Sequence, residues 1–130
     1  MMRLFLIIVA LILVPPALSY GVDPAAMLPK TMDITVQGTD QTEMLRAIMG
    51  LYFGMSAFCL IAAFKPEWRH VAMVWAVFFL YSMGLGRLLS LVVDGIPSRI
   101  LLFYMAVELT GGTIGLAIPA RERRKAQARR

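Results

Sequence analysis

Four long runs of apolar residues constrain the fold of this chain more than any other feature. Each run contains at most one charged side chain. A helix rises 1.5 Å per residue, so about 20 residues cross the roughly 30 Å of hydrocarbon in a bilayer. Helices also satisfy their own backbone hydrogen bonds, as hydrocarbon requires. We therefore predict an all-α bundle of four transmembrane helices, at residues 4–20, 44–64, 71–93 and 100–119.

Composition supports this prediction. Of the 130 residues, 59% are apolar and 16% are charged, whereas soluble domains are about 45–50% apolar and about 25% charged. A single cysteine and a single histidine exclude a disulfide framework within the chain and any multi-cysteine or multi-histidine metal site. We expect one membrane domain over residues 1–120 and a basic tail over residues 121–130.

The first apolar run has two interpretations. Pro15 and Pro16 remove helix hydrogen bonds, so a kink or an early end is expected there. The same segment also resembles a cleaved signal peptide, with Arg3, an apolar stretch and small residues near Ser19. Between this run and the next, residues 21–43 are expected to form an outer loop.

Helix-breaking residues within that loop indicate little regular structure. Pro24 and Pro29 are expected to break any helix. Residues 33–38 alternate briefly, which favours a short extended piece. Asp40 and Glu43 have the spacing of a capping box and predict the start of the second spanning helix.

Lysine and arginine are distributed unevenly between the two sides that four crossings define. Such residues gather on the cytoplasmic side of short loops, which predicts cytoplasmic N- and C-termini. The outer side carries Lys30 and Arg99. The side of the termini carries nine cations, at positions 3, 65, 69, 121, 123, 124, 125, 129 and 130.

The basic tail directly follows a membrane helix. Anionic lipid attracts each cation near the surface by about 1 kcal/mol. We therefore interpret the tail as a topology signal and lipid contact, and we expect no nucleic acid as a partner. Its first cations are Arg121, Arg123, Arg124 and Lys125.

Three charged residues lie within the spans, where an ionisable side chain is costly and faces protein, water or a partner charge. Arg46 is near the interface, Arg87 lies roughly 10 Å inside and Glu108 roughly 14 Å inside, counted from the outer helix ends. Each shares a helix face with small or polar residues that mark helix contacts. These are Gly50 and Gly54 for the first, Gly84, Ser90 and Asp94 for the second, and Tyr104, Gly111, Gly112 and Gly115 for the third.

The simplest inference is an ion pair between Arg87 and Glu108. Arg46 and Asp94 would complete a polar cluster in the outer half of the bundle. One hypothesis makes this cluster a structural clamp that fixes helix register. Its rival makes it a pocket for an anionic or polar head group, because arginine offers a forked donor.

Other chemistry is weakly represented. His70 lies at a membrane interface with no second histidine near it, Cys59 lies mid-helix, and the ten methionines are scattered. The sequence contains no hydrolase, nucleotide-binding or metalloprotease motif. We expect no enzymatic activity, no metal and no cofactor.

Three segments nevertheless resemble a known family. Residues 42–52 (TEMLRAIMGLY), 86–97 (GRLLSLVVDGIP) and 107–109 (VEL) are similar to the domain of unknown function 4345, found in small bacterial membrane proteins. The resemblance covers roughly residues 4–118. It implies four helices, a retained first helix and an inner-membrane location, and it implies no activity. A distant similarity to DoxX-like proteins is an analogy of fold alone.

Two functions remain open. The first is a structural or accessory subunit that packs as a homo-oligomer or in a larger membrane complex. The second is a binding or transport protein for a lipid head group, a quinone or a small anion, which uses the polar cluster.

Overall fold

A computed structural model describes residues 1–127, apart from the side chains of residues 122–126. The predicted all-α fold is confirmed, and four segments are long and apolar enough to span a membrane. These are α1, α3, the 3₁₀ turn η1 with α4, and α5. The elements are α1 (Met2–Gly21), α2 (Pro24–Thr31), α3 (Gly38–Phe64), η1 (Pro66–Trp68), α4 (Arg69–Val93) and α5 (Arg99–Gln127).

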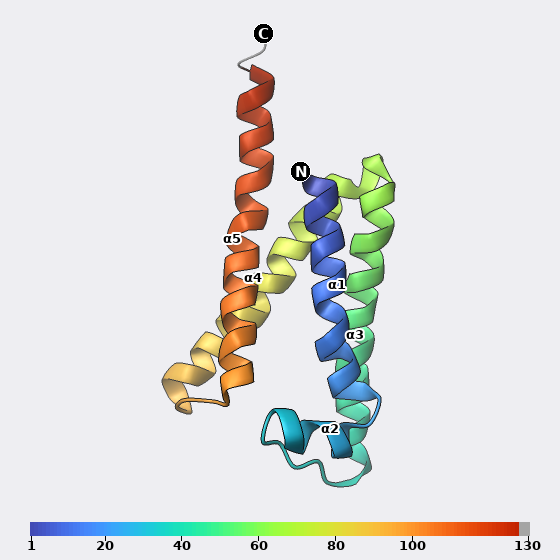
Figure 1. The fold of residues 1–130 in the computed structure, drawn as a ribbon, viewed down its shortest axis with the longest axis vertical. Coiled ribbons are helices and arrows are strands. Elements are labelled where there is room, and N and C mark those ends of the chain that lie inside the picture. The colour runs from blue at the N-terminus through green and yellow to red at the C-terminus, as the bar shows by residue number, and fades with distance from the viewer. Residues whose placement is uncertain (128–130) are drawn as a thin grey trace.

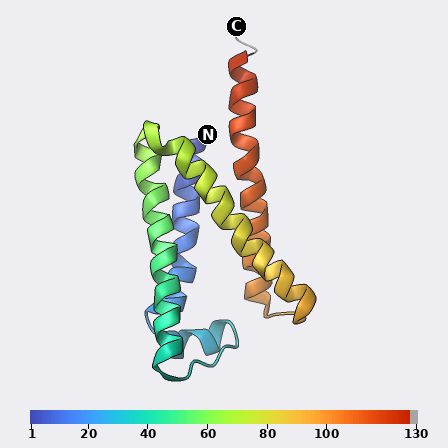
Figure 2. The same cartoon turned by 180° about the vertical axis from the view of Figure 1, so that it is seen from behind.

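The spanning helices form two pairs. Helices α1 and α3 run side by side along their length, whereas α4 crosses the bundle diagonally and meets α5 (Figure 1). The view from behind shows α3 and α4 diverging from their connection towards opposite sides (Figure 2). The short helix α2 lies at one end of the bundle, which we call the α2 end. The N-terminus and the far end of α5 both lie at the opposite end.

Helix α1 supplies much of the buried core. Its contact with α3 includes a buried hydrogen bond, in which the Ser56 hydroxyl donates to the Ala10 carbonyl at 2.7 Å. Small residues permit such a close backbone approach between membrane helices. Leu6, Ala17, Cys59 and Ala62 are fully buried near this pairing. The first apolar run is therefore an integral part of the described bundle.

Glycines on α4 and α5 allow these helices to pack closely. A Cβ atom added to Gly84 would lie 2.7 Å from the Leu109 side chain. Another added to Gly112 would lie 3.0 Å from the Tyr81 ring. Distances this short leave no room for a larger side chain, so both glycines have the packing environment expected of them.

Proline ends fewer helices here than expected. Of the two alternatives for Pro15 and Pro16, the early end is wrong, because helix α1 continues to Gly21. The prediction that Pro24 and Pro29 break any helix in the loop is also wrong. The loop contains the helix α2 despite Pro29. Asp23 explains why this helix forms, because its carboxylate accepts a hydrogen bond from the Ala26 amide at 3.1 Å. Pro24 then occupies the first helical turn, where a missing amide hydrogen costs little.

The other boundaries differ modestly from expectation. No strand is assigned within residues 33–38. Helix α3 begins at Gly38 with Gln37, rather than Asp40, as its N-cap. The Gln37 amide donates to the Gln41 side chain at 2.7 Å, which helps satisfy the free donors of the first turn. At the other end, α5 passes through Pro119 and continues to Gln127.

Close packing at Gly115 gives a test of this fold. An added Cβ atom would lie 2.6 Å from Val77 and 2.8 Å from the Phe5 ring. We expect Gly115→Leu to lower the free energy of unfolding by about 1–3 kcal/mol through overpacking. Cys59 is buried, so a thiol-reactive fluorogenic dye reports thermal unfolding in detergent. Gly86→Leu is the control, because an added Cβ there meets nothing within 4 Å. Equal melting temperatures for the two variants would contradict this packing.

Candidate functional site

The central feature of the site is the predicted ion pair between α4 and α5. Arg87 Nε donates to Glu108 Oε2 at 2.9 Å, and the two side chains are only 16% and 11% exposed. The close approach of the two helices at Gly84 places these residues on facing surfaces, since the Glu108 Cβ would lie 3.4 Å from a Cβ on Gly84. Two opposite charges thus meet inside the bundle, in its α2 half.

Aromatic side chains surround the pair. The guanidinium carbon of Arg87 lies 5.6 Å from the ring centroid of Tyr104, within the range of a cation–π contact. Tyr20 and Tyr52 pack against each other with their ring centroids 5.8 Å apart. Both tyrosines also interact electrostatically with Arg87.

Each spanning helix contributes to this arrangement. Helix α1 supplies Tyr20, α3 supplies Tyr52, α4 supplies Arg87, and α5 supplies Tyr104 and Glu108. From here on, the polar cluster means these five residues, in place of the set predicted from the sequence. Because α1 and α3 form one pair and α4 and α5 the other, the cluster joins the two halves of the bundle.

One group in the polar cluster lacks a normal partner. The Tyr52 side chain is 2% exposed, yet its buried hydroxyl makes no hydrogen bond of ordinary geometry with the described residues. An unsatisfied buried hydroxyl costs roughly 1–3 kcal/mol. Such a group in a folded protein marks strain, a bound water or a place prepared for another molecule.

A cavity of about 320 Å³ borders the polar cluster. Its volume lies at the lower end of the range for small-molecule sites. Tyr20 and Arg87 lie in its wall, and Ser82, Gly86 and Ser90 are exposed beside it on α4. The cavity therefore connects an internal ion pair with the surface between α3 and α4. Its lining residues are Tyr20, Ile48, Ser82, Met83, Gly86, Arg87 and Ser90.

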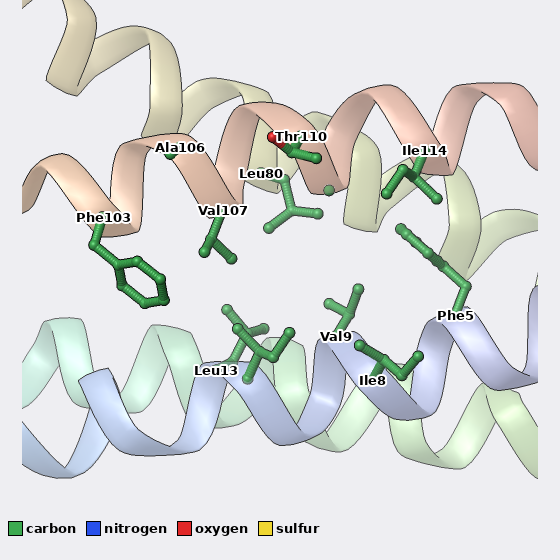
Figure 3. Close-up of a pocket in the computed structure, with 12 residues that line it drawn as sticks. Phe5, Ile8, Val9, Leu13, Leu80, Phe103, Ala106, Val107, Thr110 and Ile114 are labelled. Carbon is green, nitrogen blue, oxygen red and sulfur yellow. The ribbon is translucent and has the colours of Figure 1, made fainter.

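A larger groove of about 400 Å³ lies between α1 and α5, with Leu80 of α4 at its back (Figure 3). Phe5, Val9 and Leu13 of α1 point across it towards α5, whose Val107 points back (Figure 3). Thr110 alone among its lining residues has a side-chain oxygen. This groove suits hydrocarbon, and it offers nothing to recognise a charged group.

The structure does not join Arg46 and Asp94 to the ion pair. Arg46 is exposed, and its Nε donates to the Gly21 carbonyl at 3.4 Å. Asp94 accepts a hydrogen bond from Ser90 at 2.8 Å. The larger network predicted from helical faces is therefore wrong. The physical reason is that each residue has a nearer partner. Arg46 bonds to the Gly21 carbonyl at the end of α1, and Asp94 bonds to the Ser90 hydroxyl one helical turn away.

The predicted packing glycines divide into two groups. Gly84, Gly111, Gly112 and Gly115 face side chains of neighbouring helices. By contrast, a Cβ atom added to Gly50 or Gly54 on α3 would meet nothing within 4 Å, so among the described residues no other helix packs against them. In the basic tail, Arg121 is exposed. The side chains of the other predicted tail cations, Arg123, Arg124 and Lys125, lie outside the described residues.

Sequence reasoning missed Tyr20 and Tyr52, because tyrosine is common at membrane interfaces. Tyr20 is one residue from the α2 end of α1, whereas Tyr52 lies near the midpoint of α3. Their positions along the helices therefore do not identify the site, and it is the packing of α1 against α3 that brings the two rings together.

The polar cluster provides binding groups rather than an evident reactive pair. Arg87 and Glu108 balance each other in charge, and the tyrosines offer hydroxyl donors and acceptors. Among the described residues, no group of three histidine, cysteine, aspartate or glutamate side chains is placed to hold a metal ion. The geometry can orient a polar group beside an apolar wall.

Comparison with known proteins gives one match. The model of a family described as "Domain of unknown function (DUF4345)" matches residues 1–118. No curated protein and no solved structure matches the chain. The matched range includes α1, α3 and α4 in full, residues 99–118 of α5, and every member of the polar cluster.

The ion pair makes a prediction about stability. Arg87→Met leaves the Glu108 carboxylate buried without its partner, and we expect a loss of about 3 kcal/mol in the free energy of unfolding. The double variant Arg87→Met/Glu108→Met removes both charges and should recover most of that loss, because two apolar side chains need no mutual compensation. Thermal unfolding monitored through Cys59 measures both effects. A double variant no more stable than the single one would contradict a direct pairing.

Proposed function

This chain belongs to the DUF4345 family, and we propose that it is a multi-pass membrane protein that binds an amphiphilic molecule at the polar cluster. The polar head of the ligand occupies the cavity beside Arg87. Its hydrocarbon part remains among the apolar side chains and the acyl chains around α3 and α4. The observation that carries this proposal is the partly buried ion pair in contact with an open cavity.

The geometry favours binding over a purely structural clamp. A clamp needs only the two charged side chains, and it needs no accessible space beside them. Here Arg87 also lines a cavity of about 320 Å³. A cavity with a few convergent polar groups in a mostly apolar wall is typical of a small-molecule site.

We further propose a topology with both termini in the cytoplasm. Nine cations on the side of the termini, against two on the other, support this orientation. The α2 end, and with it the cavity, then lies towards the outer leaflet. We propose a bacterial inner membrane as the location, and the site would then lie within reach of lipids in its outer leaflet.

A non-catalytic role fits the same residues. Binding needs donors and acceptors, which Arg87 and the tyrosines supply. Catalysis by a nucleophile would need an adjacent base, and the cluster pairs its carboxylate with an arginine. We therefore propose recognition or presentation of a ligand without a bound cofactor.

The ligand proposal predicts stabilisation by an amphiphile. The probes are 1-oleoylglycerol and 1-oleoylglycerol 3-phosphate, which share one chain and differ in head-group charge. At a concentration 100 times its Kd, a ligand stabilises the folded state by about 2.7 kcal/mol. We expect at least one probe to raise the melting temperature of the protein in detergent.

Two matched variants test whether the amphiphile binds at the polar cluster. Arg87→Met/Glu108→Met should abolish the stabilisation while keeping the fold. Arg99→Met is the control, because Arg99 is exposed at the start of α5 and outside the cavity. If the double variant is stabilised as strongly as the control, the amphiphile binds elsewhere and the proposal is wrong.

Self-association is a second candidate, and the exposed glycines of α3 favour it. Gly50 and Gly54 have the spacing of a membrane dimerisation motif, and a Cβ atom added to either would meet none of the described residues within 4 Å. Leu51 beside them is 59% exposed. A second copy of the chain could pack its own α3 against this face, as could a partner in a larger membrane complex.

This candidate predicts a change of mass without loss of the fold. The double variant Gly50→Leu/Gly54→Leu would keep α3 helices apart, and an oligomer in mild detergent should become a monomer. Light scattering combined with size-exclusion chromatography measures the protein mass. A wild-type protein that is already monomeric in nanodiscs and in mild detergent would contradict self-association.

A further inference from the structure

The charge balance of the polar cluster indicates what kind of head group fits beside it. Glu108 neutralises Arg87 at 2.9 Å, and the other three members are uncharged tyrosines. An added anion in the cavity would approach a guanidinium whose charge Glu108 already balances. In a poorly solvated site an unbalanced charge is costly, whereas an uncharged polar group needs only hydrogen bonds.

The tyrosine hydroxyls provide unused hydrogen-bonding capacity. The Tyr52 hydroxyl is buried without a hydrogen bond of ordinary geometry to the described residues. Its ring packs edge-on against Phe79, with the centroids 5.4 Å apart, and tilted against Tyr20. These contacts hold the ring in place and so fix the position of the hydroxyl oxygen.

Tyr20 connects this buried hydroxyl with the cavity. Its side chain is 8% exposed and lies in the cavity wall together with Arg87. Its ring packs against that of Tyr52, and Tyr52 interacts electrostatically with Arg87. A small head group in the cavity therefore contacts Tyr20 and Arg87 directly, and both of these residues are neighbours of Tyr52.

We propose that the ligand is an uncharged amphiphile, whose hydroxyl- or carbonyl-bearing head is bound by Tyr20 and Tyr52 beside the Arg87–Glu108 pair. This inference rests on the proposed function and specifies its ligand class. Arg87 keeps its bond to Glu108 and orients the tyrosine hydroxyls. The tyrosines supply the selective hydrogen bonds, and the ion pair disfavours a second anion.

The experiment compares two probes on three proteins. Affinities of 1-oleoylglycerol and 1-oleoylglycerol 3-phosphate are measured in nanodiscs by titration, for the wild type, Tyr52→Phe and Tyr81→Phe. Tyr81 is the control, since its hydroxyl bonds to Thr113 at 3.0 Å and lies outside the cavity. Removing one good hydrogen bond weakens binding by about tenfold.

We expect the wild type to bind the uncharged probe more tightly than the phosphate. Tyr52→Phe should weaken binding of the uncharged probe by about tenfold, and Tyr81→Phe should leave it unchanged. Tyr20→Phe gives an independent second measurement, with the same direction expected. Phenylalanine keeps each ring and its packing, so these variants should retain the fold.

Three results would overturn this inference. Tighter binding of the phosphate probe would show an anion site, and equal affinities for the wild type and Tyr52→Phe would exclude the hydroxyl. A higher melting temperature of ligand-free Tyr52→Phe with unchanged affinity would show that the hydroxyl is an unpaired group with no role in binding. In each case the proposed function survives if Arg87→Met/Glu108→Met still abolishes binding. Binding that this double variant retains would contradict both.

Discussion

A pair of opposite charges that must avoid hydrocarbon determines how this bundle is arranged. Arg87 and Glu108 can meet at 2.9 Å only if α4 and α5 approach closely in the α2 half, which glycine at position 84 permits. The pair must also be covered on its remaining side. Tyr20 and Tyr52 from α1 and α3 provide this cover, so one interaction links both pairs of helices.

The diagonal course of α4 follows from competing contacts. Near its start, α4 is tied to the end of α3, where Arg69 donates two hydrogen bonds to the Ala63 carbonyl, at 3.3 and 3.1 Å. Near its end, α4 must reach α5 to form the ion pair. A straight helix that satisfies both contacts crosses the bundle (Figure 2). The space left beside α4 is the cavity lined by Arg87, so the same geometry that shelters the charges also leaves one of them accessible.

The sequence was sufficient for the parts of this structure that depend on length and on single helix faces. Four apolar runs with at most one charge each predicted four spanning helices, and charge position predicted the Arg87–Glu108 pair. Prediction failed where a hydrogen bond to a nearby group determined the local structure. Asp23 caps a helix that Pro29 was expected to prevent, and the end of α1 provides a carbonyl for Arg46. Tyr20 and Tyr52 were missed because a tyrosine at an interface and one in a buried site have the same local sequence pattern.

The clamp and the binding site make different demands on the tyrosines. A clamp would be equally well covered by phenylalanine, which packs like tyrosine and avoids an unsatisfied hydroxyl. The hydroxyl of Tyr52 therefore lowers stability unless something else bonds to it. Natural proteins keep such local costs mainly where a ligand or a conformational change uses them. The presence of this hydroxyl beside an accessible ion pair is thus the strongest physical argument for a site that receives another molecule.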